Sequence, residues 1–171
     1  MRTTAVVLLT LLTLALLPGV AHAESKVLRD GPTAGTPPEA DILWVRIADR
    51  PRTIRLELTF RDLRAGRRAQ TRVAILPSRG RSDFLATALR RANGSERNRL
   101  MVATDQEFGG SPIPCRGFRT TWQPGQDRVV MVVPHRCLAP RAQRHRFKAI
   151  AGFWTFTGPG DSTRFIGLDR G

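Results

Sequence analysis

The sequence predicts an all-β fold, an antiparallel β-sandwich of seven to nine short strands, with a barrel as the second choice. Three observations predict this fold. Apolar and polar residues alternate with the two-residue period of a strand, turn signals rich in Gly, Pro and Asn separate these stretches, and no long helical period occurs beyond residue 23. Many short strands joined by turns are typical of sandwiches and barrels.

The chain begins with the features of a secretory signal peptide. Arg2 leads into an uncharged apolar run of 13 residues, 5–17, and the small-residue site Ala21-His22-Ala23 follows. A helix that spans a bilayer needs about 20 consecutive apolar residues, so this run is too short for a membrane anchor. We expect cleavage after Ala23, export of the protein, and no transmembrane segment in the mature chain.

Cleavage of residues 1–23 would leave 148 residues, the size of one domain. Residues 24–39 are polar and turn-rich and show no apolar period, which predicts a flexible lead-in. We therefore expect the sandwich domain to comprise residues 40–171.

The first two predicted strands show the clearest alternation. Residues 41–47 place one set of side chains on one side, Leu43, Val45 and Ile47, and another set on the opposite side, Ile42, Trp44 and Arg46. Residues 53–60 follow a turn and alternate Ile54, Leu56, Leu58 and Phe60 with Arg55, Glu57 and Thr59. This second segment predicts a strand that is buried on one face and wet on the other.

The middle of the chain predicts three further strands. Residues 71–76 form one that Pro77 ends. Residues 83–90 and 99–104 flank Asn93-Gly94, the strongest short hairpin signal, although 83–90 would also suit one or two helical turns. Asn93-Gly94-Ser95 also matches a glycosylation acceptor, but only for a secreted eukaryotic protein, so a hairpin turn is the favoured interpretation.

The last predicted strands are 115–122, 128–133, 145–154 and a short segment, 163–168. A turn over 123–127 separates the first two of them. The uninterrupted apolar run 129–133 predicts a central strand that is covered on both faces.

The two cysteines, Cys115 and Cys137, predict one disulfide, because such a pair in an exported domain is most often bonded. Residues paired across a hairpin have residue numbers with a constant sum, and the midpoint of the two cysteines, Gln126, lies inside the predicted turn. We expect them opposite one another on the two strands, or nearly so, in a bridge that adds about 3 kcal/mol. His135 would share a strand face with Cys137, but the bridge leaves no free thiol for redox or nucleophilic chemistry.

The chain is strongly basic, with 28 Lys and Arg against 14 acidic residues. Arg2 is the only charged residue among the first 23, so the mature chain carries a formal charge of +13. The excess lies in two zones, +10 over residues 46–99 and +5 over residues 136–148. Such a surface attracts polyanions in a salt-sensitive way. Export argues against intracellular nucleic acid, so an anionic envelope polymer or polysaccharide is the expected partner.

Nine basic residues in two clusters are the candidate anion-binding residues. They are Arg61, Arg64, Arg67, Arg68 and Arg72 in the first cluster, and Arg141, Arg144, Arg146 and Lys148 in the second. The alternative is compositional, since 26 of the 28 basic residues are Arg, a usage that a GC-rich coding sequence produces without selection for binding. Convergence of the two zones on one face would favour binding, and scatter would favour the compositional alternative.

The residues predict no catalytic site, no cofactor and no metal centre. His135 and His145 belong to no zinc motif, and no calcium loop surrounds carboxylates such as Asp41 and Asp161. No nucleophile elbow, phosphate loop or dinucleotide fingerprint occurs. Two alternatives stay open: a small secreted hydrolase whose site assembles in space around a histidine, and a secreted inhibitor or effector with an exposed loop such as 108–114.

Trp44, Trp122 and Trp154 are candidates for a sugar-binding platform, because aromatic faces pack on sugar rings and arginines can reinforce them for acidic ligands. All three lie in or beside apolar strand segments. Core packing is therefore the favoured interpretation.

Several stretches resemble a group of small exported actinobacterial β-sandwich proteins. They are residues 39–47, residues 54–63, residues 132–140 around Cys137, and the ending 167–171. The resemblance spans most of the mature chain and is carried by strand and disulfide signatures. It implies a sandwich fold and export, and it implies no catalytic residue, because the group has no assigned activity. We therefore expect an exported non-catalytic protein.

Overall fold

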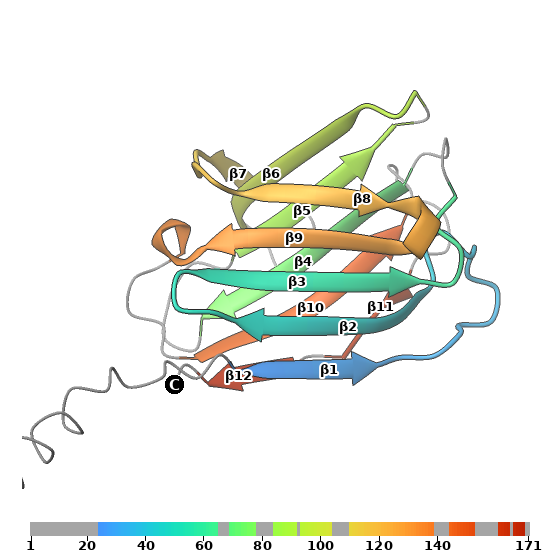
Figure 1. Ribbon diagram of the computed structural model, residues 1–171, viewed down its shortest axis with the longest axis horizontal. Helices are drawn as coiled ribbons and strands as arrows, with labels where there is room; N and C mark the ends of the chain where they lie inside the picture. Colours follow the sequence, from blue (N-terminus) through green and yellow to red (C-terminus); the bar gives the residue numbers. More distant parts are fainter. Residues whose placement is uncertain are drawn as a thin grey trace, which may run out of the picture.

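The computed structural model describes residues 24–64, 69–77, 84–91, 93–103, 110–138, 144–152, 161–164 and 166–169. They form two antiparallel sheets that lie face to face (Figure 1). The expected all-β sandwich is confirmed, and within the described residues the two sheets do not close into a barrel. The expected signal peptide, residues 1–23, lies outside the described part.

The five-stranded sheet is the nearer layer in Figure 1. Its strands follow the order β1-β2-β3-β9-β8, and every neighbouring pair is antiparallel. Their bounds are β1 Ser25–Arg29, β2 Ile42–Asp49, β3 Thr53–Phe60, β9 Arg128–Pro134 and β8 Arg119–Gln123. The short 3-10 turn η1, Pro124–Gln126, joins β8 to β9.

The seven-stranded sheet forms the layer behind it. Its order is β11-β10-β4-β5-β6-β7, and β12 pairs with β10 beside this path. The bounds are β4 Ala69–Pro77, β5 Phe84–Arg90, β6 Glu96–Ala103, β7 Gly110–Ile113, β10 Arg144–Gly152, β11 Asp161–Ser162 and β12 Ile166–Asp169. No helix in the described part of the chain is long and apolar enough to cross a membrane.

Twelve strands occur in the described residues, against the seven to nine expected. The three that the sequence pattern does not predict, β1, β7 and β11, are short and lie at sheet edges. An edge strand needs little apolar surface. In β1, for example, only Leu28 is buried, so no alternation marks it.

The core lies between the two sheets and confirms the alternation predicted for residues 53–60. The inward side chains of β3 are at most 2% exposed: Ile54, Leu56, Leu58 and Phe60. They belong to one cluster with inward side chains of β9 and β5, namely Val129, Met131 and Val133, and Phe84, Ala86 and Ala88. The segment 83–90 is therefore a strand, β5, rather than helical turns.

The turn at Asn93-Gly94 joins β5 to β6, as expected. Gly94 has a φ of +80°, a conformation that glycine adopts without steric cost, and its N–H donates to the carbonyl of Arg91. Ser95 N–H donates to the side chain of Asn93 at 3.0 Å.

One expectation about side-chain orientation is wrong, and another holds only in part. A bulge between Ile42 and Trp44 turns Ile42 into the core, where it is fully buried, instead of onto the side of Trp44. The run 129–133 has only one face in the core. Val130 and Val132 alternate with the core residues of β9 and therefore belong to the outer face of the sheet. On that face Val130 is buried and Val132 is half-buried, so the expected cover on both faces holds for Val130 and not for Val132.

Residues 24–39 are not a flexible lead-in. β1 pairs with β2 over its whole length, and Thr33 N–H donates to Asp41 Oδ1 at 3.1 Å. Thr36 and Glu39 are buried. This segment escapes a pattern-based prediction because polar contacts, rather than an apolar stripe, hold it in place.

Carboxylates join the two sheets beside this segment. Asp161 of β11 accepts a hydrogen bond from Ile42 N–H at the start of β2 (2.8 Å). Asp41 is fully buried and lies 3.2 Å from Arg61 Nη1. Burial, followed by the charges of Asp161 and Asp41, raises the pKa of the neighbouring Asp30. These acids tie β2 to β11, and no group of three or more potential metal ligands occurs among the described residues.

Candidate anion-binding surface

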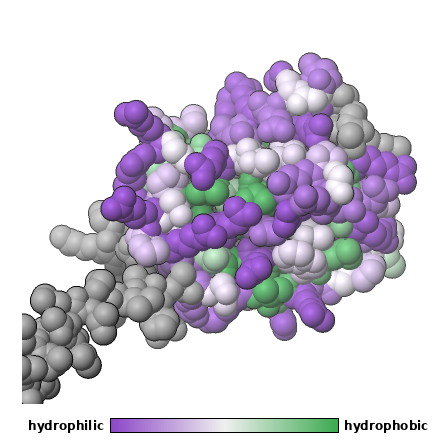
Figure 2. Space-filling view, in the orientation of Figure 1, coloured by the Kyte–Doolittle hydropathy of each residue, from purple (hydrophilic) through white to green (hydrophobic). Residues whose placement is uncertain are grey.

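The outer face of the five-stranded sheet is rich in arginine. Since β3 turns its apolar side chains inward, Arg55 faces outward, between Ala48 of β2 and Val132 of β9. Arg119 of β8 pairs with Val132 from the other side. One row across the sheet therefore carries two arginines separated by a single valine. Figure 2 shows this face, on which hydrophilic residues cover most of the surface.

The first hollow on this face has a volume of about 310 Å³. It lies where the β2–β3 turn approaches the segments that precede β8 and follow β9. Among the described residues, its lining holds five arginines and no carboxylate: Arg50, Arg52, Arg55, Arg119 and Arg136, with Thr53, Gly117, Val132 and Pro134.

The second hollow is similar in size, about 310 Å³, and contains one carboxylate. Its lining is Arg46, Ala48, Arg50, Arg55, Glu57 and Arg128. Arg50 and Arg55 line both hollows, so the two are neighbours. Together the two linings, as far as the structure describes them, present seven arginines and a single carboxylate.

Glu57, whose side chain is 10% exposed, holds two of these arginines. Its Oε1 accepts a hydrogen bond from Arg128 Nη1, and its Oε2 lies 3.6 Å from Arg55 Nε. Arg128 Nε also donates to Gln123 Oε1 at 2.8 Å. The hydrogen bonds fix the guanidinium group of Arg128, and the ion pairs with Glu57 offset part of the charge of both arginines.

The other arginines on the two hollows have fewer partners. Among the described residues, no hydrogen bond or ion pair is made by the side chains of Arg46, Arg50, Arg52 and Arg119, and all four are exposed. Like charges held close together repel, and a bound anion relieves that repulsion. The planar guanidinium group also matches carboxylate, sulfate and phosphate oxygens in bidentate contacts. The surface is therefore suited to binding anionic groups.

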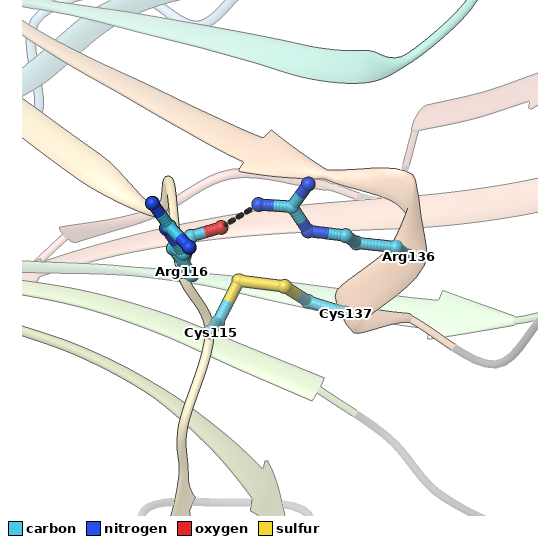
Figure 3. The surroundings of a disulfide bond; sticks show 4 residues. All are labelled: Cys115, Arg116, Arg136 and Cys137. Atoms are coloured by element: carbon cyan, nitrogen blue, oxygen red, sulfur yellow. Dashed lines mark hydrogen bonds between the residues drawn. A yellow bond between two sulfur atoms is a disulfide. The ribbon is translucent and has the colours of Figure 1, made fainter.

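The disulfide joins two segments that each contribute a lining residue to the first hollow, Gly117 and Arg136. Cys115 and Cys137 are bonded, with their Cα atoms 5.6 Å apart, which confirms the expected bridge (Figure 3). Neither cysteine lies on a paired strand, however. Cys115 precedes β8, and Cys137 ends the 3-10 turn η2, His135–Cys137. The two strands diverge from regular pairing before they reach the cysteines, so the bridge joins their extensions.

This bridge positions two lining residues of the first hollow. Arg136 Nη2 donates to the carbonyl of Arg116, as Figure 3 shows. Gly117 follows with a φ of +94°, in a turn closed by the hydrogen bond from Phe118 N–H to Cys115 O (3.1 Å). The disulfide thus holds the turn that contains Gly117 against η2, which carries Arg136.

His135 forms a separate pair with Asp49. Its Nε2 lies 2.7 Å from Asp49 Oδ1 and 3.0 Å from the backbone oxygen of Arg50. Both neighbours are acceptors, so Nε2 carries a hydrogen. Neither His135 nor Asp49 is among the described lining residues of the two hollows, and the pair ties η2 to the β2–β3 turn. The expectation that His135 shares a strand face with Cys137 is wrong, because both residues belong to η2.

The two candidate basic residues whose side chains the structure describes, Arg61 and Arg64, are both partnered within the protein. Besides its contact with Asp41, Arg61 donates from Nη2 to the carbonyl of Thr36 at 2.7 Å. Arg64 Nε donates to Asp62 at 2.5 Å, and this hydrogen bond raises the pKa of Arg64. Neither arginine lines the hollows. Both hold the chain that follows β3.

The side chains of the remaining candidates lie outside the part of the chain that the structure describes. Arg72 lies on β4, and its neighbour β10 carries Arg144, Arg146 and Lys148. The structure thus brings members of the two clusters onto adjacent strands, but in the other sheet. Arg67, Arg68 and Arg141 lie outside the described residues.

The residues that do line the hollows carry a partial signal in the sequence. Arg46 and Arg55 lie on the polar side of predicted strands, and Arg50 and Arg52 belong to the turn between them. Arg119, Arg128 and Arg136 join them only because β9 pairs with β3 and β8 with β9. That pairing joins segments about 70 residues apart, such as Glu57 and Val130, and no local pattern encodes it.

The tryptophans divide between core and surface. Trp122 is 7% exposed and belongs to the core cluster, which confirms the core interpretation for it. Trp44 is half-buried on the outer face of β2, opposite Thr59 of β3. Trp154 lies outside the described residues. In the segment 108–114, residues Gly110–Ile113 form β7 rather than a loop.

Neither a scan of protein-family models nor a search of curated proteins finds a match to this chain.

Proposed function

We propose that this is an exported, non-catalytic protein that binds an anionic polymer of the cell envelope through the two hollows. The observation that supports it most is the seven arginines and one carboxylate around neighbouring hollows on one sheet face. A concave surface of one charge raises the local concentration of the opposite charge. A polymer that crosses both hollows would contact several guanidinium groups at once.

Export is the second part of this proposal. The expected signal peptide and the disulfide both suit an oxidising compartment. The resemblance to small exported actinobacterial β-sandwich proteins supports the same view. Mass spectrometry of the culture medium should find a chain that begins at Glu24, and a cell-retained chain that keeps residues 1–23 would contradict export.

Binding is tested by retention on immobilised polygalacturonate and polyphosphate over a series of salt concentrations. The double variant Arg50→Gln/Arg119→Gln removes two unpartnered arginines, one of which lines both hollows. We expect it to elute at clearly lower salt than the wild type, with a logarithmic salt dependence smaller by about 2.

The matched control is Arg97→Gln/Arg99→Gln, which removes the same charge from exposed positions of β6 in the other sheet. It should elute close to the wild type. If the two double variants elute at equally reduced salt concentrations, net charge alone governs retention. Retention that does not change with salt concentration would contradict the proposal.

A further inference from the structure

We propose that the polymer is an acidic polysaccharide, bound with an anionic group in the first hollow and sugar hydroxyls at Glu57 in the second. This inference rests on the proposed function and narrows it to one class of ligand. It separates acidic polysaccharides from anionic chains without hydroxyl groups, such as polyphosphate.

The two hollows differ in the hydrogen bonds that they offer. The first presents five arginines, which only donate, so its ligand group must accept hydrogen bonds and carry negative charge. The second adds the carboxylate of Glu57, which accepts and repels anions. A ligand unit that fits the second hollow must therefore bring O–H or N–H donors as well as acceptors for the arginines. Sugar units have both, whereas polyphosphate has acceptors only.

One carboxylate oxygen of Glu57, Oε2, accepts no hydrogen bond from a described residue. Oε1 is used by Arg128, but Oε2 lies 3.6 Å from Arg55 Nε, which is longer than a hydrogen bond. No other hydrogen bond reaches Oε2 in the part of the chain that the structure describes. Because Glu57 lines the hollow, this oxygen is placed to accept from a ligand hydroxyl.

Trp44 is an independent indication of a sugar ligand. Glu57 pairs directly with Arg46 of β2, and Trp44 lies two residues before Arg46 on the same outer face. Its ring is half-buried, which leaves part of it exposed to solvent. The C–H groups of a sugar ring pack on an aromatic face, and a polyphosphate chain offers no such groups. Arginine, carboxylate and aromatic residues therefore share the outer face of two neighbouring strands.

The experiment measures affinity by isothermal calorimetry for three probes: oligogalacturonate, its O-acetylated form, which keeps the carboxylates but blocks the hydroxyls, and polyphosphate of matched charge. For the wild type we expect acetylation to weaken binding at least about tenfold, the effect of losing a hydrogen bond to a charged group. Equal affinity for the free and acetylated probes would overturn the inference.

Variants then locate the effect. Glu57→Gln should weaken oligogalacturonate binding about tenfold, leave the acetylated probe unchanged or bound more tightly, and strengthen polyphosphate binding through the loss of a negative charge. Trp44→Leu should weaken binding of the free sugar probe without changing that of polyphosphate. Arg119→Gln, the control in the first hollow, should weaken all three probes by the same factor.

These measurements distinguish a failure of the polysaccharide inference from a failure of the proposed function. If Glu57→Gln strengthens all three probes alike, Glu57 contributes only its charge, and the inference fails while the proposed function stands. If none of the probes binds the wild type, the proposed function itself fails. If thermal unfolding shows that Glu57→Gln does not fold, the wild-type comparison of free and acetylated probes decides the question.

Discussion

The contacts of each arginine determine whether it stabilises the fold or remains available to a ligand. Arg61 contacts the buried carboxylate of Asp41 and a backbone carbonyl, so its charge is used within the protein. Arg119 is exposed beside other arginines and has no hydrogen bond or ion pair to a described residue. Two residues of one type therefore have opposite energetic roles, and net charge alone does not distinguish them.

This difference predicts opposite effects on stability. Arg61→Gln leaves Asp41 buried without its counter-ion, so the free energy of unfolding should fall by about 1 to 3 kcal/mol. Arg119→Gln removes a repulsive charge at the surface and should change that free energy by no more than about 0.5 kcal/mol. Urea unfolding of the two variants at neutral pH checks this. A loss for Arg119→Gln as large as that for Arg61→Gln would contradict the assignment.

At the scale of elements, two connections position the β8–β9 hairpin in the sheet. At its turn, Asp127 adopts a φ of 50°. The backbone carbonyl of Asp127 accepts a hydrogen bond from the N–H of Phe60, the last residue of β3 (2.8 Å), and its carboxylate accepts one from the N–H of Leu63 (2.7 Å). At its open end, the disulfide joins the two extensions. The hairpin supplies Arg119 and Arg128, so these connections determine where the two arginines lie relative to β2 and β3.

Loss of the disulfide should therefore affect both stability and binding. Cys115→Ser/Cys137→Ser removes a bridge between residues 22 apart in sequence, which should lower the free energy of unfolding by about 3 kcal/mol. It also releases the turn with Gly117 from η2, so the variant should elute from polygalacturonate at lower salt while still folded. Circular dichroism and retention measured together check this. If the variant is less stable but folded and its retention is unchanged, the disulfide does not position the binding residues, and this prediction is wrong.

The sequence predicts those strands that bury one apolar face in the core. It does not predict segments that are held in place by polar hydrogen bonds. The alternation at residues 53–60 predicts both the strand and its outward arginine, because one face packs on the core. The cysteine midpoint predicts the hairpin and the bridge. β1 and the contacts of Asp41 and Asp161 escape prediction, since polar hydrogen bonds hold them and leave no apolar period.

At the scale of the whole molecule, the binding surface is a product of topology. Along the sequence, the β2–β3 hairpin is separated from β8 and β9 by the strands β4 to β7, which belong to the other sheet. In space, β9 lies directly beside β3, and β8 lies beside β9. This order gathers arginines from both basic zones, Arg46 to Arg55 and Arg136, on one face. It also adds Arg119 and Arg128 from a segment of the chain with no net charge. Of the sequence clusters, Arg61 and Arg64 follow β3 and line neither hollow, and Arg144 and Arg146 belong to β10 of the other sheet.

The outer face of the five-stranded sheet is the surface that we propose binds the polymer. Nuclear magnetic resonance of the arginine Nε–H groups during titration with oligogalacturonate measures where the polymer binds. We expect the largest shifts at Arg50, Arg55 and Arg119, with the indole N–H of Trp44 moving alongside them. Shifts confined to β4 and β10, where Arg72 and Arg146 lie, or spread evenly over all arginines, would contradict this proposal.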